Sequence, residues 1–237
     1  MKNKKASHVG FILSFVIFVT FLIFLFSIFG SPFKFSRDQT PLVDYLETEL
    51  NSKFTSNLTI ITISPPLEDH EACIKIDINN LLLDYLKETN TIIKDKNNNI
   101  LDSKISGKNL FFTWPENENF FKIYYSEEIN TENKNTEEPC YSAQNQDIKF
   151  ITENKYFSTK KIYNLFEEYN SNYETLKEEL NFPSNNNFAL SFIDANEEET
   201  QTDYKETTTD IYAREIPIQY INESANINSG FINIKVW

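Results

Sequence analysis

An uninterrupted apolar run near the N-terminus constrains this chain more than any other feature. The twenty residues from 10 to 29 carry no charge, and most of them are Phe, Ile, Leu or Val. A helix of this length spans about 30 Å, the thickness of the hydrocarbon core of a bilayer. The run therefore predicts a transmembrane helix over residues 10–30, with membrane lipid as the partner of residues 10–29.

The charges on either side of the run predict an orientation. Lys2, Lys4 and Lys5 precede it, so the positive-inside rule places residues 1–9 in the cytoplasm as a basic leader and the C-terminal part outside the cell membrane. Two other interpretations stay open, a cleaved secretory signal and a buried core helix. We favour a retained anchor, because a signal has a shorter apolar region and a small residue where Ile28 and Phe29 stand.

The outer part is strongly acidic. All 35 acidic residues follow the apolar run, whereas three of the 22 basic residues precede it, which leaves the outer part with a formal charge of −16. Such a surface repels nucleic-acid phosphates, so nucleic-acid binding is excluded. An aromatic content of 15% supplies a sizeable core. The partners that remain are an envelope protein or a second copy of the chain, as a homo-oligomer.

Residues 31–146 have the pattern of a β-rich unit. Thr40 and Pro41 predict the cap and first residue of an amphipathic helix over 41–54, with Leu42, Leu46, Leu50 and Phe54 on one face. Alternating apolar residues then predict a β-sandwich-like unit with strands at 58–63 and 74–78, a hairpin of 91–95 with 100–105, and a pair of 110–114 with 120–125. Residues 127–146 are predicted to be an acidic loop or linker, and 81–87 are ambiguous between helix and strand.

Residues 147–237 predict a second extracytoplasmic unit, in which a helix packs on an antiparallel sheet. Ser158 is the expected cap of a helix that ends before Pro183 and is interrupted near Asn172. Strands are predicted at 148–157, at 188–192, near 211–220 and at 230–237, with a solvated acidic insert at 197–209. The fold class is therefore α+β, with an N-terminal transmembrane helix.

Cys73 and Cys140 are the only cysteines. In an oxidising exterior such a pair is a candidate disulfide with one possible connectivity, although two separate thiols stay an alternative. The same exterior would expose two N-glycosylation sequons, at Asn57 and Asn222.

No catalytic, cofactor-binding or metal site is predicted. His70 stands alone among acidic residues after two prolines, as a solvated loop residue would. Asp95-x-Asn97-x-Asn99 and Asp194-x-Asn196-x-Glu198 resemble the start of a calcium loop, but both lack the Gly and Glu that such a loop needs later. A hairpin turn explains the first of them better.

Two resemblances add an expected location. The ending of the chain, with residues 176–183 before the final strands and 230–237 closing the sheet, resembles uncharacterised single-pass envelope proteins of archaeal type. Lys4, Lys5, Ala6 and Ser7 ahead of the apolar run resemble the processing site of type IV pilin-like proteins, although Phe11 and the Gly30-Ser31-Pro32 break depart from that pattern. The resemblances imply a membrane-anchored protein with a structural or interaction role in the envelope. A pilin-like subunit processed after Ala6 and an extracytoplasmic enzyme are the alternatives.

Overall fold

The computed structural model describes residues 5–29, 39–66, 71–78, 90–130, 134, 139–203, 207 and 210–237, and the side chains of 9–26 within the first range. The chain divides into two compact units, Met1–Asp38 and Gln39–Trp237. His70 and the ambiguous segment 81–87 lie outside the described residues.

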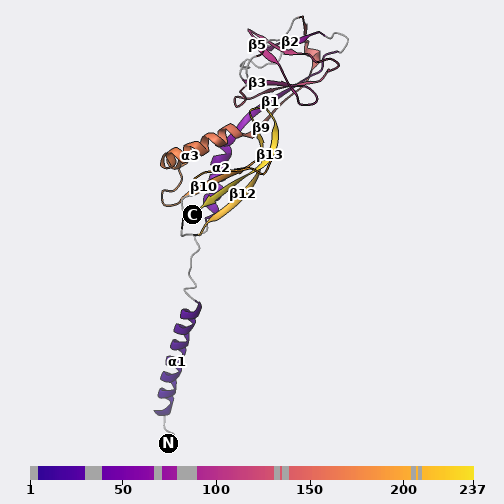
Figure 1. Ribbon diagram of the computed structural model, residues 1–237. Coiled ribbons are helices and arrows are strands. Elements are labelled where there is room, and N and C mark those ends of the chain that lie inside the picture. Colours follow the sequence, from indigo (N-terminus) through magenta and orange to yellow (C-terminus); the bar gives the residue numbers. More distant parts are fainter. Residues whose placement is uncertain are drawn as a thin grey trace. The chain divides into compact units, whose positions relative to one another are not determined.

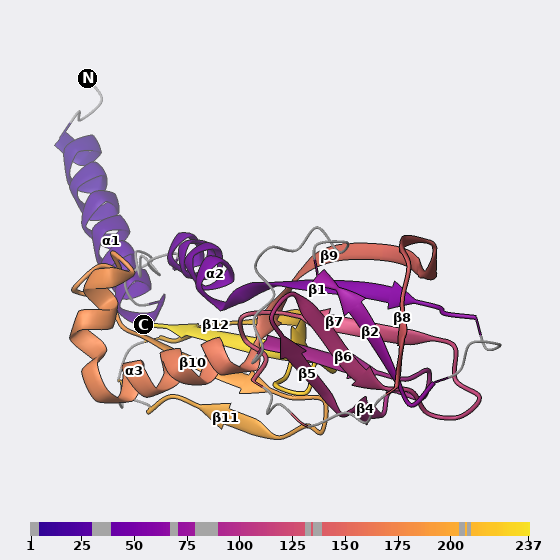
Figure 2. The ribbon, with the colours of Figure 1, turned by 90° about the horizontal axis from the view of Figure 1, so that it is seen from above.

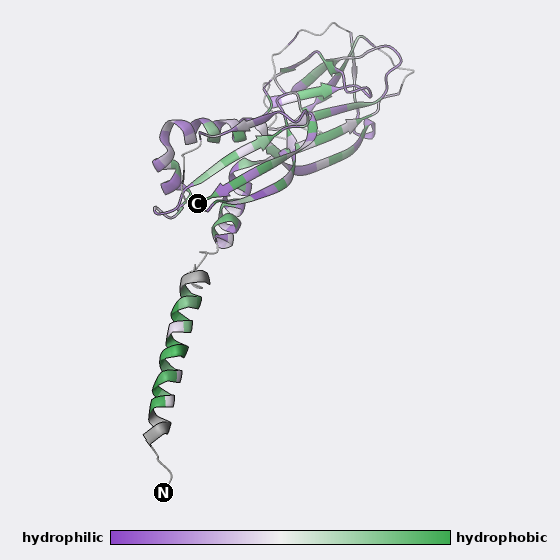
Figure 3. Cartoon of the chain, turned by 60° about the horizontal axis from the view of Figure 1, so that its bottom comes forward, coloured by the Kyte–Doolittle hydropathy of each residue, from purple (hydrophilic) through white to green (hydrophobic). Residues whose placement is uncertain are grey.

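The described part of the first unit is a helix, α1 (Lys5–Phe29), of 25 residues. Apolar residues occupy nearly all of its length, as the mostly green ribbon of this helix in Figure 3 shows. The window Val9–Phe26 is long and apolar enough to cross a membrane, and none of it is buried. The N-terminal apolar helix is thus present, and it is compatible with a single-pass anchor.

The second unit is mixed α+β, which confirms the broad fold class (Figure 1). Its helices are α2 (Thr40–Phe54), α3 (Thr159–Glu179) and the short 3-10 helix η4 (Asn145–Asp147). Its strands are β1 (Thr55–Ile63), β2 (Cys73–Asp77), β3 (Thr91–Lys94), β4 (Ile100–Leu101), β5 (Ser103–Ser106), β6 (Asn109–Thr113), β7 (Phe121–Tyr125), β8 (Cys140–Ser142), β9 (Ile148–Ser158), β10 (Phe188–Ile193), β11 (Glu199–Gln201), β12 (Tyr212–Ile221) and β13 (Ile227–Val236).

The strands form two sheets (Figure 2). The first has nine strands in the order β11-β10-β13-β12-β9-β1-β7-β3-β4, and the second has four in the order β5-β6-β2-β8. Strand β9 pairs with β1 along nearly its whole length but with β12 only at Phe157 and Ser158. The first sheet takes strands from both sides of residue 146, although the division into units at 31–146 and 147–237 stays a prediction.

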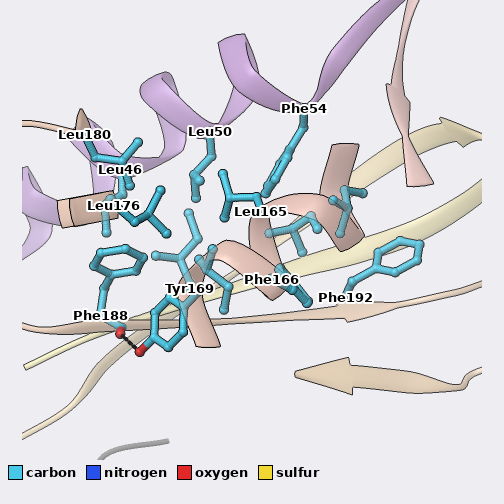
Figure 4. Close-up of a cluster of buried hydrophobic side chains, with 14 of the residues drawn as sticks. Leu46, Leu50, Phe54, Leu165, Phe166, Tyr169, Leu176, Leu180, Phe188 and Phe192 are labelled. Carbon is cyan, nitrogen blue, oxygen red and sulfur yellow. Dashed lines mark hydrogen bonds between the residues drawn. The ribbon is translucent and has the colours of Figure 1, made fainter. Parts of the chain in front are cut away.

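The largest core lies between the two helices and one face of β10, β13 and β12. Register places Phe188, Leu190 and Phe192 of β10 opposite alternate residues of β13, so all of them face the helices. Figure 4 shows Leu46, Leu50 and Phe54 of α2 meeting side chains of α3 and β10 in this cluster. The fourth-residue periodicity of α2 therefore predicted its buried face correctly, except that Val43 is buried and Leu42 only partly.

A second core lies between the two sheets. Ile61 and Ile63 of β1, with Phe121 and Ile123 of β7, share one cluster with residues of the second sheet such as Phe112. The opposite face of β1 and β7 carries a smaller cluster that includes Leu58, Tyr124 and Ile221. Alternation along β1 thus sends successive side chains into different cores.

Several expectations about element boundaries and pairing were wrong. Gln39, not Thr40, is the N-cap of α2, and its side chain makes no capping hydrogen bond. The segments 110–114 and 120–125 do not pair, because β6 belongs to the second sheet and β7 to the first. In the expected hairpin of 91–95 with 100–105, only β4 pairs with β3, and β5 crosses to the other sheet.

The two segments predicted to be irregular also contain strands. Residues 127–146 include β8, which pairs in parallel with β2, and 197–209 include β11, which pairs with β10. The last strand begins at Ile227, earlier than residue 230. By contrast, Ser158 caps α3 as expected, by accepting from the Lys161 N–H, and the helix is kinked at Asn172.

Three hairpins close with the same five-residue loop, which we term the Asx loop. It occupies residues 95–99 between β3 and β4, 194–198 between β10 and β11, and 222–226 between β12 and β13. In each, the first side chain accepts from the third and fifth backbone N–H groups at 2.8 to 3.1 Å. The fourth residue has a positive φ in all three loops, at Asn98, Glu197 and Ala225. The calcium-like spacing is therefore the sequence signature of a hairpin loop, as expected for the first copy.

Candidate functional site

A polar cleft of about 520 Å³ lies beside the start of β1. The pairing of β1 with its neighbours β7 and β9 brings the side chains of one wall together. Asn57 stands opposite Lys155, and Thr59 stands between Glu153 and Tyr125, so these side chains share one face of the first sheet. The cleft is lined by Ser52, Thr55, Ser56, Asn57, Thr59, Tyr125, Glu127, Glu153, Lys155 and Lys161. Charges of both signs and several hydroxyl groups therefore meet in one hollow.

A carboxylate ties the elements around this cleft together. Glu128 accepts from the Ser56 hydroxyl at 3.0 Å and from the Ser158 hydroxyl at 3.3 Å, and its carboxylate lies 3.5 Å from the Lys161 ammonium. Lys161 also donates to the Thr55 carbonyl at 2.8 Å. Because Glu128 links β1 to the first turn of α3, its role here is to join elements, and the Ser56–Glu128 hydrogen bond is part of that link.

The glycosylation candidates lie in different surroundings. Asn57 is exposed on β1, and its Nδ2, the atom that a glycan would modify, donates to Glu153 at 2.9 Å. Asn222 is the first residue of an Asx loop, and its Oδ1 accepts from the loop N–H groups. Asn57 is thus exposed and Asn222 lies at a hairpin tip, and the occupancy of both sequons stays a prediction.

The predicted disulfide is present between Cys73 and Cys140. The two cysteines stand directly opposite each other in the parallel pairing of β2 with β8, with Cα atoms 4.5 Å apart. That distance lies within the range that disulfides occupy in proteins. The bond therefore fastens the edge strand β8 to the second sheet.

Lys94 was not anticipated from the sequence, although it is 2% exposed. Its ammonium donates to the Asn226 Oδ1 at 2.7 Å and to the Ala225 carbonyl at 3.1 Å, and it lies over the Tyr124 ring. Burial, followed by repulsion from Lys122, lowers the pKa of Lys94 below its ordinary value of 10.5. The residue fixes the third Asx loop to β3, and its only sequence signal is a lysine that ends an apolar strand.

Within the part of the chain that the structure describes, no group of three His, Cys, Asp or Glu side chains could hold a metal ion. The Asx-loop carboxylates of Asp95 and Asp194 are already used by backbone N–H groups.

Comparisons of the chain with protein-family models, curated proteins and solved structures found no match.

Proposed function

We propose that this chain is a single-pass membrane protein whose outer part has a structural or interaction role in the cell envelope. The observation that carries the proposal is the combination of a long, uncharged apolar stretch in the N-terminal helix with an acidic unit that has hydrophobic cores and a disulfide. A protein disulfide persists in an oxidising compartment. A basic leader held in the cytoplasm would place the unit that carries the disulfide on the opposite, oxidising side of the membrane. A β-sandwich-like interpretation of the two sheets fits this role, because such units display edges and loops to partners.

The full-length chain tests the proposal in cells that produce it. We expect the protein in carbonate-washed membranes, protease access to the acidic unit in intact cells, and thiol labelling of Cys73 and Cys140 only after reduction. A variant carrying Phe18→Arg and Phe21→Arg should leave the membrane fraction, because each arginine costs about 3 kcal/mol near the centre of a span. A freely soluble full-length protein with both thiols reduced would contradict the proposal.

The processing of the leader separates the pilin-like alternative from a retained anchor. N-terminal sequencing of the mature protein should find the intact leader if the chain is a plain anchored protein. A new N-terminus at Ser7 would favour the pilin-like subunit, and one beyond residue 29 would indicate a cleaved signal.

A further inference from the structure

Strand β9 exposes a long edge that the fold leaves open. Residues 148–156 pair with β1 on one side, and the only pairing to β12 begins at Phe157. Among the described residues no strand covers the second side of this segment. Phe150 is 69% exposed and Ile151 is 46% exposed on it.

The open edge of β9 differs from the outermost strands of the described sheets in its length. The outer strands of the two sheets, β4, β11, β5 and β8, are two to four residues long. A further open edge, on β12, carries Pro217, which has no N–H to offer another strand. Short strands and edge prolines are among the means by which proteins prevent unwanted strand pairing, and the open edge of β9 is long and free of proline, so it is a candidate for pairing.

The sequence of this edge is complementary to itself in one antiparallel register. Centred on Ile151, two copies place Lys149 opposite Glu153 twice and Phe150 opposite Thr152 twice, while Ile151 meets its own copy. Opposite charges and aromatic–β-branched pairs are the cross-strand pairs that stabilise sheets. A register centred on Thr152 would instead bring Lys149 against Lys155.

One other register, centred on Asn154, also matches charges, by pairing Glu153 with Lys155. It would place Phe150 opposite Ser158 and Ile151 opposite Phe157, but both of those partners already pair with β12 on this side of β9. Lys149 and Glu153, the charged pair of the Ile151 register, keep the capacity to form further hydrogen bonds. Lys149 lies at the register shift opposite Thr62 and Ile63 and donates to the Gln146 carbonyl, while Glu153 accepts from Asn57. An ammonium has three donors and a carboxylate accepts several bonds.

We propose that two copies of this chain associate by antiparallel pairing of their β9 edges about a two-fold axis at Ile151. The pairing joins the two nine-stranded sheets into one continuous sheet. In this proposal, the partner of the interaction role is a second copy of the chain. The proposal rests on the proposed function, since anchoring in one membrane brings copies of the chain together.

Cross-linking of the full-length chain in membranes tests the register. Ile151→Cys should give a covalent dimer on mild oxidation, because directly opposed Cβ atoms lie about 5 Å apart. Asn154→Cys is the matched control: its two copies would lie about 20 Å apart along the strands and should stay monomeric. A dimer from Asn154→Cys, or none from Ile151→Cys, overturns the proposal.

A charge swap tests the pairing without cysteines. Lys149→Glu should lower dimer affinity roughly tenfold, since each introduced carboxylate would face Glu153 of the other copy, and adding Glu153→Lys should restore it. Light scattering of the full-length protein in detergent gives the mass, and an intact Cys73–Cys140 bond shows that each variant is folded. A wild type that is monomeric at all concentrations, or a double variant as weak as the single one, contradicts the pairing. Either result would leave membrane location and disulfide oxidation, and thus the proposed function, unaffected.

Discussion

At the scale of single residues, the first position of each Asx loop determines how the hairpin closes. Asp95 and Asp194 use a carboxylate for this purpose, whereas Asn222 uses an amide oxygen with the same two backbone partners. The geometry therefore needs an oxygen acceptor and not a charge. Burial raises the pKa of Asp95, but hydrogen bonds from Asn99 and Asn97 outweigh it and hold that pKa below its ordinary value.

We expect Asp95→Ala to destabilise the unit Gln39–Trp237 by about 1–2 kcal/mol, because two loop N–H groups lose their acceptor. Asp95→Asn should cost much less at neutral pH, since Asn222 shows that an amide suffices. The lowered pKa means that the advantage of aspartate is present above its ordinary pKa of 3.8 and is lost as the pH falls through the folded-state pKa. Urea unfolding of the three proteins at neutral and acidic pH measures both effects, and an alanine variant as stable as wild type at neutral pH would refute the role of the loop.

The lowered pKa of the buried Lys94 predicts that the free energy of unfolding depends on pH. Here the group is a cation that burial disfavours, whereas Asp95 is an anion that hydrogen bonds favour. Because the pKa of Lys94 is lowered in the folded state, the unfolded chain binds more protons between that pKa and 10.5, so the free energy of unfolding should rise with pH in this window. Lys94→Met should remove that increase. The groups that face the Lys94 ammonium are Lys122, the Tyr124 ring, and the oxygens of Ala225 and Asn226.

Unfolding curves from neutral pH to the alkaline range for wild type, Lys94→Met and the exposed control Lys108→Met give the comparison. As the pH rises, the wild type should gain stability relative to Lys94→Met. An unchanged difference would mean that Lys94 keeps an ordinary pKa.

At the scale of elements, the close approach of β13 to the end of β10 depends on Gly230. A Cβ at this position would overlap the Ile193 carbonyl oxygen and touch the Tyr220 ring. The Tyr220 hydroxyl accepts a hydrogen bond from the Ala195 N–H, so the ring has little room to move. The constraint is therefore one of space, chiefly between backbone and backbone.

Gly230→Ala is expected to destabilise the unit Gln39–Trp237 by about 1–3 kcal/mol, the usual cost of overpacking. Ser229→Ala, at the adjacent exposed position, should change stability by less than about 0.5 kcal/mol. Thermal unfolding of both variants provides the test, and a Gly230→Ala variant as stable as wild type would show that β10 shifts at no cost.

At the scale of the whole molecule, the disulfide closes a long segment of chain. Cys73 and Cys140 are 67 residues apart, and the segment between them includes strands of both sheets. A cross-link of this kind restricts the unfolded chain, and its contribution grows with the length of the loop. The second sheet, whose four strands are short, depends on it most.

Replacing both cysteines by serine should lower the free energy of unfolding by about 2–5 kcal/mol. Denaturant unfolding of the double variant, compared with the wild type before and after reduction, measures this loss. The reduced wild type should match the variant, and a variant as stable as the oxidised protein would show that the bond contributes nothing.

The elements that depend on near neighbours were predicted well. The apolar run, the four-residue periodicity of α2, the Ser158 cap and the break at Asn172 are local patterns, and each has its counterpart in the structure. The strands themselves were mostly found, but not their partners, because backbone hydrogen bonds pair any two strands and leave no mark on the sequence.

The sequence by itself determined the apolar helix, the helices of the unit Gln39–Trp237 and the chemistry of the hairpin loops, since these arise from residues within a few positions of each other. Only the tertiary structure decided that β6 and β7 lie in different sheets, that β8 brings Cys140 opposite Cys73, that Lys94 reaches Asn226, and that β9 keeps an open edge. These depend on contacts between segments far apart in the chain, which form only when the sheets and cores assemble together.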